Sequence, residues 1–305
     1  MQGFRTNQLN QGIYMKQKRI SHTLLACAAS LIIAAPVQAA LVNFQNFNDL
    51  SAFSLNGATG TINTGAQGVV GPNPGDDRVL RLTNNLGQAG SAFLTNPFSL
   101  ASDASFSSFF EFQFTDQQNT GADGIVFTVQ TVANNAGGGG GGIGYQGLSP
   151  SIGVEFDNWN NGAVDGFNGN HAGIDINGNI NSVVRADVLP AQLDSGAIFN
   201  AWVDYNGVTD LLEVRLALNS TRPSAALMSH TVDLVSLLGT TDAFIGFTSG
   251  TGAAGADHDI RRWVFDGQFN PITNPGNPGG TVPEPGILAL FSIALLGFFL
   301  NRRKA

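Results

Sequence analysis

The segment Ser151–Asn179, SIGVEFDNWNNGAVDGFNGNHAGIDINGN, places a polar loop between two apolar runs. Its first run, Ser151–Phe156, is β-branched and apolar, which is typical of a strand. Because side chains alternate along a strand, Glu155 and Asp157 project from one face, and their apolar neighbours project from the other. The residues of the segment that could ligate a metal are Glu155, Asp157, Asn161, Asp165 and His171. The segment therefore predicts a strand with one face on a core and one face at a site.

The neighbouring carboxylates of Glu155 and Asp157 repel each other unless they are protonated or neutralised, and a divalent cation neutralises both. Oxygen ligands alone suit calcium, whereas an imidazole with carboxylates suits manganese or zinc, and the segment holds both kinds. An EF-hand does not fit, because the twelfth position counted from Asp157 is Asn168 and not a glutamate. The alternative to a metal site is a solvated acidic turn.

The long middle of the chain reads as a succession of strands. Phe110, Phe112 and Phe114 alternate with polar residues, and this period of two places the three rings on one face. Further strands are expected at residues 124–132, 201–205, 211–218, 244–248 and 263–269. Asn206-Gly207 signals a hairpin turn, and only residues 229–238 could hold a short helix. With 39 glycines and 12% charged residues, the composition favours one all-β domain, an antiparallel β-sandwich.

The predicted domain, residues 40–270, is acidic and lacks cysteine. Residues 40–283 keep seven arginines, no lysine and 21 of the 22 acidic residues, which gives a net charge of −14. Nucleic acid is therefore not expected as a partner, because no basic surface would neutralise its phosphates. Calcium or a neutral sugar fits this charge better. Packing, with help from metal, must stabilise the domain without disulfides.

The first 39 residues have the organisation of a signal peptide. A positively charged start is formed by Lys16, Lys18 and Arg19. The apolar run Leu24–Ala35 follows, and Val37-Gln38-Ala39 fits the small-residue cleavage pattern. Met15 is an alternative start, because the residues before it lack apolar periodicity. Cys27 invites a lipoprotein interpretation, but the apolar run continues beyond it, so we expect this cysteine to be inert.

The C-terminal end has the composition of a sorting tag. A linker rich in proline and glycine, residues 271–281, precedes Val282-Pro283-Glu284-Pro285, an apolar run to Leu300 and the basic cluster Arg302-Arg303-Lys304. This order resembles the PEP-CTERM sorting signal. The resemblance implies that segment 282–305 enters the membrane, that an exosortase processes it, and that the domain reaches the periplasm, cell surface or extracellular matrix. The alternative is an ordinary tail anchor, although the apolar run is shorter than the usual span of about 20 residues.

Five segments follow one another in a recognisable order. One of them is the segment Ser151–Asn179 described above, with VEFDNWNN, Asp165 and HAGIDING. The other segments are ADGIVF (122–127), the glycine loop 140–145, WVDYNG (202–207) and GFTSGTGAAGADHDIRRWVF (246–265). Together they resemble the legume-type (L-type) lectins. The resemblance implies a jelly-roll sandwich, concanavalin A-like, that binds carbohydrate.

The resemblance also implies a role for each matching residue. The ligands of a transition metal, Mn²⁺ or a similar ion, would be Glu155, Asp157, Asp165 and His171. The ligands of Ca²⁺ would be Asp157, the Trp159 carbonyl, Asn161 and Asp165. The groups that bind carbohydrate would be Asp123, the N–H of Gly141, the Trp159 ring, Asn161 and, in the loop that sets sugar choice, Ala254. Calcium would hold these groups in place without touching the sugar, and the peptide between Ala122 and Asp123 would be cis.

The sequence departs from the lectin pattern at several positions. Asn158 stands where threonine is usual, and Gly166 stands where proline is common. The six-glycine run Gly137–Gly142 leaves the register of the N–H donor open by a residue or two. His258 and Asp259 could form another metal pair, but the resemblance implies a structural role for both.

These observations predict an exported, calcium-dependent carbohydrate-binding protein, without enzymatic activity, that associates with exopolysaccharide or the cell surface. A homo-oligomer would raise its avidity for repeated sugars. The sequence leaves two alternatives. One is a glycoside hydrolase that uses Glu155 and Asp157 on a similar sandwich, although their strand offers no third acid. The other is a structural matrix protein that uses the fold without binding sugar.

Overall fold

The computed structural model describes residues 41–63 and 66–276. The expected signal peptide, residues 1–39, and the expected sorting segment, residues 282–305, lie outside the described residues, as do Met15 and the end of the expected linker. Within the described part of the chain, no helix combines the length and hydropathy that a membrane span needs.

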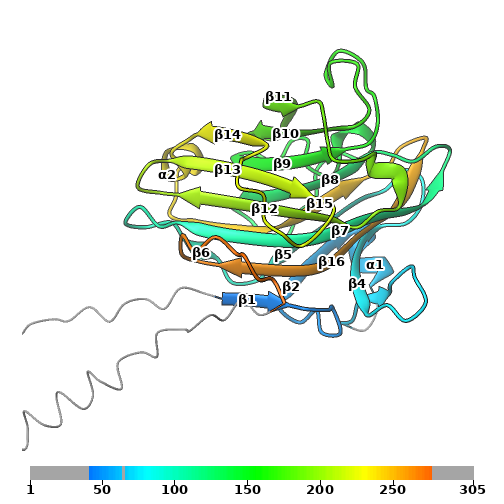
Figure 1. Cartoon of the computed structure of the whole chain (residues 1–305), viewed down its shortest axis with the longest axis horizontal. Coiled ribbons are helices and arrows are strands. Elements are labelled where there is room, and N and C mark those ends of the chain that lie inside the picture. Colours follow the sequence, from blue (N-terminus) through cyan, green and yellow to red (C-terminus); the bar gives the residue numbers. More distant parts are fainter. Residues whose placement is uncertain (1–40, 64–65, 277–305) are drawn as a thin grey trace, which may run out of the picture. The chain divides into compact units, whose positions relative to one another are not determined.

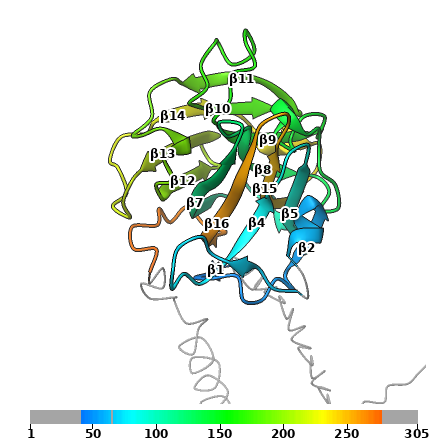
Figure 2. The ribbon, with the colours of Figure 1, turned by 90° about the vertical axis from the view of Figure 1, so that its right-hand side faces the viewer.

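Two eight-stranded antiparallel sheets face each other (Figures 1 and 2). The β7 sheet consists, in spatial order, of β14 (Met228–Thr231), β13 (Leu211–Ala217), β12 (Phe199–Asn206), β7 (Phe106–Gln118), β16 (Gly255–Asp266), β4 (Arg78–Thr83) and β3 (Val69–Val70), with β1 (Leu41–Phe44) beside β16. The β9 sheet consists of β11 (Asn179–Ala186), β10 (His171–Ile176), β9 (Ser151–Asp157), β8 (Gly124–Gln130), β15 (Asp242–Gly250), β5 (Ala89–Leu94) and β2 (Phe53–Gly57), with β6 (Phe98–Ser99) beside β15. The predicted all-β antiparallel sandwich is confirmed.

The core between the sheets is dominated by phenylalanine. Phe110, Phe112 and Phe114 of β7 all belong to it, as their period of two predicts. Phe110 stacks on Phe127 of β8 with 5.7 Å between ring centroids, and Phe112 lies 4.8 Å from Phe156 of β9. Because these contacts cross from one sheet to the other, the rings hold the two layers together.

Most strands lie where the sequence pattern predicts them, and two regions differ. β16 begins at Gly255, well before the expected start at residue 263. Its first half is polar, and the buried Asp259 is paired with Arg81, which an apolar pattern does not reveal. The region 229–238 holds most of β14 as well as a short helix, α2 (Leu234–Leu238), and a second short helix, α1 (Ala58–Ile62), was not expected.

The direction of β16 separates the two ends of the sandwich. β16 starts at Gly255, which pairs with Gln118 at the end of β7, just before the loop that leads to β8, and it ends at Asp266, which pairs with Leu41 of β1 (Figure 1). At about 3.3 Å per residue, these two ends lie about 36 Å apart. The following residues, 267–276, return over the outer face of the β7 sheet, where the buried Trp202 donates from Nε1 to the Ile272 carbonyl at 2.8 Å.

Candidate functional site

Three neighbouring strands of the β9 sheet bring the predicted site residues together. β9 ends at Asp157, which is paired with His171 at the start of β10 on one side and with Gly124 at the start of β8 on the other. Asp123 immediately precedes β8. Asp123, Asp157 and His171 therefore meet at one end of the sheet, although they are far apart in sequence.

A compact group of ligand atoms is formed by Glu155, Asp157 and His171. One ligand atom from each residue lies within 4.8 Å of the others, and all three side chains are buried. His171 Nε2 lies 3.3 Å from Glu155 Oε1, while its Nδ1 lies 3.1 Å from the Asn168 carbonyl. Because a carbonyl only accepts, a proton on Nδ1 would satisfy it, and Nε2 would then be available to a metal beside the carboxylates. This orientation suits an imidazole that ligates a metal.

The loop after β9 folds back over this group. The Trp159 N–H donates to Asp157 Oδ1 at 2.7 Å, and the Asn161 N–H donates to the carboxylate of Asp165. Asp165 is buried, whereas Trp159 is partly exposed and Asn161 is exposed. The loop therefore turns its acids inward and its ring and amide outward.

The electrostatics of this group point to a missing positive charge. Burial, and then the Glu155 carboxylate, raise the pKa of Asp157 well above its usual range. Burial also raises the pKa of Asp165. Within residues 41–63 and 66–276, no arginine or lysine forms an ion pair with Glu155, Asp157 or Asp165. The donor set of carboxylates, amide and imidazole fits Ca²⁺ together with a transition metal, which would supply that charge.

Asp175 is an acid of this cluster that the sequence analysis did not include. It is fully buried on β10, opposite Gly153, and burial followed by the Glu155 charge raises its pKa well above the usual range. Ser182 of β11 donates to Glu155 Oε1. The alternation of His171 and Asp175 on β10 could have identified Asp175, because both positions share one face.

A second half of the site surrounds Asp123. The peptide between Ala122 and Asp123 is cis, as the resemblance implies. The Asp123 side chain is buried, and its Oδ2 lacks a hydrogen-bond partner among the described residues. Burial, and then the Asp165 charge, raise its pKa to about 7. A side chain at Gly252 would come within 3.4 Å of Asp123 Oδ2, so this unused acceptor lies beside the loop that contains Ala254.

Glycines allow the remaining segments to approach. A side chain at Gly141 would collide with the amide of Asn161, so the Gly141 backbone lies against that amide. The Gly140 N–H donates to the Thr251 carbonyl at 2.9 Å, which ties the glycine loop to the loop 251–256. Ala254 is itself buried, and its carbonyl accepts from the Gly252 N–H. The structure thus brings Asp123, Gly141 and Asn161 together. Ala254 belongs to the adjoining loop, and its side chain is buried.

The departures from the lectin pattern have local explanations. Asn158 is buried and donates to the Asp194 carboxylate. Gly166 has φ of +57° and packs against the Arg185 guanidinium, so a larger residue there would be strained and would collide.

The His258–Asp259 pair is structural. His258 Nδ1 bonds with Thr83 Oγ1 at 2.7 Å, and burial lowers the pKa of His258 to about 3. Asp259 accepts from Arg81 Nε at 2.7 Å. Both side chains are fully buried, and only Nε2 of His258 lacks a partner among the described residues. Neither residue belongs to a group of three possible metal ligands in the described part of the chain, which agrees with a structural role.

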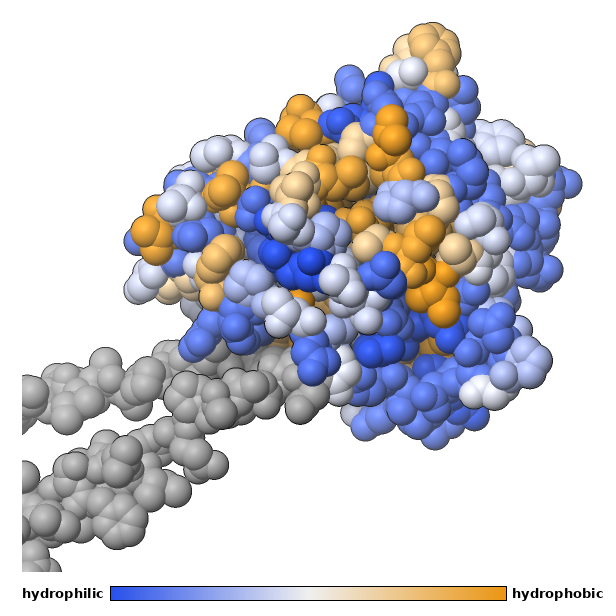
Figure 3. All heavy atoms as spheres, in the orientation of Figure 1, coloured by the Kyte–Doolittle hydropathy of each residue, from blue (hydrophilic) through white to orange (hydrophobic). Residues whose placement is uncertain are grey.

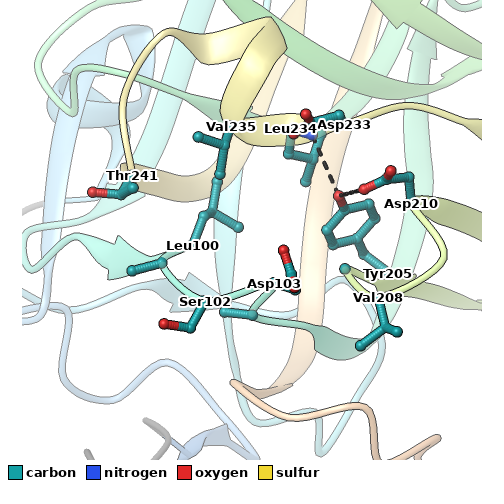
Figure 4. A pocket seen from close by; sticks show the side chains of 13 residues that line it. Leu100, Ser102, Asp103, Tyr205, Val208, Asp210, Asp233, Leu234, Val235 and Thr241 are labelled. Carbon is teal, nitrogen blue, oxygen red and sulfur yellow. Dashed lines mark hydrogen bonds between the residues drawn. The ribbon is translucent and has the colours of Figure 1, made fainter.

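A cavity of about 340 Å³ lies at the opposite end of the sandwich (Figure 4). It contains three acids, but two of them already serve the fold. Asp210 accepts from the Tyr205 hydroxyl at 3.2 Å, and Asp233 caps α2 by accepting from the Ser236 N–H at 3.0 Å. Asp103 is exposed. None of the three acids that line this cavity has a buried oxygen without a hydrogen-bond partner, whereas Asp123 at the other end has one.

Comparison with known proteins gives two family matches. A family model described as legume lectin domain matches residues 42–278, and one described as PEP-CTERM protein-sorting motif matches residues 281–304. The chain is 30% identical over 212 residues to L-type lectin-domain containing receptor kinase VIII.1 of Arabidopsis thaliana, a match that covers 66% of this chain and 29% of the relative. It is 33% identical over 216 residues to probable L-type lectin-domain containing receptor kinase I.2 of the same plant, with 62% and 32% covered. The chain thus spans about a third of the length of these relatives.

Solved structures show the same architecture. Peanut lectin with a 9mer peptide is 26% identical, with a TM-score of 0.61, over 75% of this chain and 97% of that chain. The lectin from Bauhinia forficata in complex with GalNAc is 25% identical, with a TM-score of 0.60, over 75% and 98%.

Proposed function

Because the chain belongs to the legume lectin domain family and carries a PEP-CTERM sorting motif, we propose that it is an exported, calcium-dependent carbohydrate-binding protein of the cell surface or exopolysaccharide. The family and the sorting motif agree with the resemblances drawn from the sequence. Beyond the family and the sorting motif, we propose that the protein binds calcium, that named residues contact the sugar, and that the protein is located outside the cell.

One observation carries the proposal. The buried acids, which have no arginine or lysine partner among the described residues, lie beside Asp123, Gly141 and Asn161, and these three residues converge from separate segments. A calcium ion held by Asp157 and Asp165 would fix the loop that carries Asn161. The transition-metal position would use Glu155 and His171 with the same two aspartates. The metal would thus supply rigidity and charge, and the chain's own groups would contact the sugar.

The groups at the surface of the site suit a monosaccharide. The ionised Asp123 carboxylate would accept hydrogen bonds from two neighbouring hydroxyls, and the Asn161 amide and Gly141 N–H would donate. The Trp159 ring would cover the C–H face of the sugar. Each such bond contributes about 0.5–1.5 kcal/mol net, so a single site binds weakly.

Avidity would compensate for weak single sites. A homo-oligomer that meets repeated sugars gains affinity without any new contact. On the face seen in Figure 3, hydrophobic side chains gather in several groups between polar ones. Homo-oligomerisation stays a prediction, which the mass of the purified protein in solution would test.

The hydrolase alternative fits the site less well. Glu155 and Asp157 are both buried, and each is engaged within the cluster, by Ser182 or by the loop after β9. A glycosidase needs two carboxylates that reach opposite sides of a bound sugar. We infer that these acids hold metal and do not attack a glycosidic bond.

A glycan array tests the proposed function. The full-length chain is applied in calcium and again after chelation, beside Asp123→Asn as a variant that keeps every metal ligand. We expect binding in calcium, loss after chelation, and at least a tenfold loss in the variant, because hydrogen bonds to a charged group contribute about 1.5–3 kcal/mol. Failure to bind any glycan in either condition would contradict sugar binding and favour the structural matrix protein.

A further inference from the structure

An aromatic ring projects into solvent from the loop that joins two metal-site residues. Phe167 lies between Asp165 and His171, and 74% of its surface is exposed. The ring contributes nothing to the core at that exposure. We propose that Phe167 stacks on a second sugar ring of a longer glycan, so that the site prefers chains to monosaccharides; this inference rests on the proposed function.

The backbone beneath Phe167 is held in an unfavourable conformation. Phe167 has φ of +63°, a left-handed value that bulky residues seldom adopt. Its N–H donates to the Gly162 carbonyl at 2.7 Å, and the Asn168 N–H donates to the Asp165 carbonyl at 3.1 Å. Strained residues of this kind persist where surrounding bonds over-determine them, and they gather at ligand-binding positions.

The outer side of the loop is supported by β11 and the residues that follow it. The Arg185 guanidinium packs against Gly166 and pairs with Asp187 at 2.6 Å. Asn168 donates from Nδ2 to the Asp187 carbonyl at 3.2 Å. The ring therefore stands on a fixed base, and binding would require little additional ordering of the loop.

The loop places Phe167 beside the proposed sugar site. Gly162, which accepts the Phe167 N–H, directly follows Asn161 in the chain. Gly169 packs back against Trp159, because a side chain at residue 169 would lie 3.4 Å from the Trp159 carbonyl carbon. Trp159 and Phe167 are thus the two rings of one folded loop, with Asn161 between them in the chain.

The chemistry of this pair suits a linear oligosaccharide. A pyranose presents a C–H face that packs on an aromatic ring, and Trp159 is assigned to the first sugar. Phe167 lacks a polar group, so it discriminates by the presence of a second ring and not by its hydroxyl pattern. The exposed Val188, which directly follows Asp187, adds apolar surface near the base of the loop.

The test compares glycans of different length on the full-length chain in calcium. The probes are an array that presents each hexose and N-acetylhexosamine both as a monosaccharide and as a linear tetrasaccharide. Phe167→Ala should weaken tetrasaccharide binding about fivefold and leave monosaccharide binding within about twofold, on the scale of one aromatic stacking contact. Phe167→Tyr should restore the tetrasaccharide preference. Phe269→Ala removes another exposed phenylalanine far from the site and should change neither value.

Each other outcome overturns the inference. Equal loss for both lengths, together with a lower melting midpoint in calcium, assigns Phe167 a structural role in the loop. Unchanged tetrasaccharide binding leaves the monosaccharide site intact but rejects the extended site. Absence of binding by the unaltered chain rejects the proposed function itself, and the inference with it.

Discussion

Two groups of buried acids occupy the outer faces of the two sheets, and they are neutralised in different ways. On the β7 sheet, the fully buried Asp204 is paired with Arg215 at 3.4 Å and with Arg222. On the β9 sheet, Glu155 and Asp157 are equally buried, and no arginine or lysine of the described residues pairs with either. The charge of the first group is neutralised by arginines of the same chain, whereas the proposed metal would neutralise the second. Burial alone therefore does not distinguish the two groups; the presence or absence of arginine partners among the described residues does.

Removing the Asp204 carboxylate, which pairs with Arg215 and Arg222, should lower the free energy of unfolding more than any other substitution considered below. Asp204→Asn removes the carboxylate that Arg215 and Arg222 share, and it leaves the buried Arg215 with Glu213 as its remaining partner. Removing one partner of a buried ion pair lowers the free energy of unfolding by about 3–5 kcal/mol. Because no metal is involved, the loss should be the same in calcium and in chelator. Urea unfolding under both conditions measures it, and a loss confined to calcium would show that the two groups are not independent.

Removing the Asp157 carboxylate from the β9 sheet should lower the free energy of unfolding by an amount that depends on whether calcium is present. Asp157→Asn removes a shared ligand, so in calcium at a hundred times its dissociation constant the variant loses about 2.7 kcal/mol of stabilisation. In chelator the variant should differ by less than about 1 kcal/mol, because burial raises the pKa of Asp157 and so favours its protonated form, which asparagine resembles in shape. Urea unfolding beside Asp204→Asn makes the comparison direct. An equal loss in both conditions would mean that Asp157 acts in the fold and not through metal.

A further effect should appear in the pH dependence of the chelated protein. Burial raises the pKa of Asp123 to about 7, from 3.8, and raises that of Asp157 and Asp165. The folded chain then holds protons that the unfolded chain has lost, so stability falls as pH rises from about 4 to 7, and the Asp123 shift alone sets an upper limit of about 4 kcal/mol. Calcium should diminish this fall, because the bound ion stabilises the ionised carboxylates.

Asp76 has a pKa shifted in the opposite direction, so it serves as a reference for the pH dependence of stability. A hydrogen bond from Arg261 lowers the pKa of Asp76 to about 2, so its contribution is constant above pH 4 and is lost as pH falls toward 2. Melting midpoints between pH 4 and 7.5, with and without chelator, give the two curves. Parallel curves would contradict a link between the raised pKa values and the metal.

Local patterns in the sequence were sufficient to predict most of the strands and the strand face that carries Glu155 and Asp157. The alternation of Glu155 and Asp157 predicts one shared face, and the phenylalanines of β7 predict the other layer of the core, because both follow from a period of two within one strand. The hairpin at Asn206-Gly207 also forms, with Asn206 paired to Leu211 across the turn.

Contacts that depend on register between distant strands could not be predicted in this way. The period of two places Asp175 on the same face as His171, but its contact with Glu155 arises only because β10 pairs with β9. Arg81 meets Asp259 only because β4 pairs with β16. The composition of residues 271–281 predicts a plain linker, yet Ile272 is buried against Trp202. Each of these contacts joins residues that no short-range pattern connects, so only the assembled sheets reveal them.

The most direct test of this account follows sugar binding and thermal stability across a single calcium titration. The metal-stripped, full-length chain is titrated with calcium while its melting midpoint and its binding to one glycan identified on the array are recorded. The account predicts that both rise over the same calcium range, because one ion neutralises the acids and fixes the loop that carries Asn161. Glycan binding that is equally strong in chelator, with a melting midpoint that calcium leaves unmoved, would contradict it.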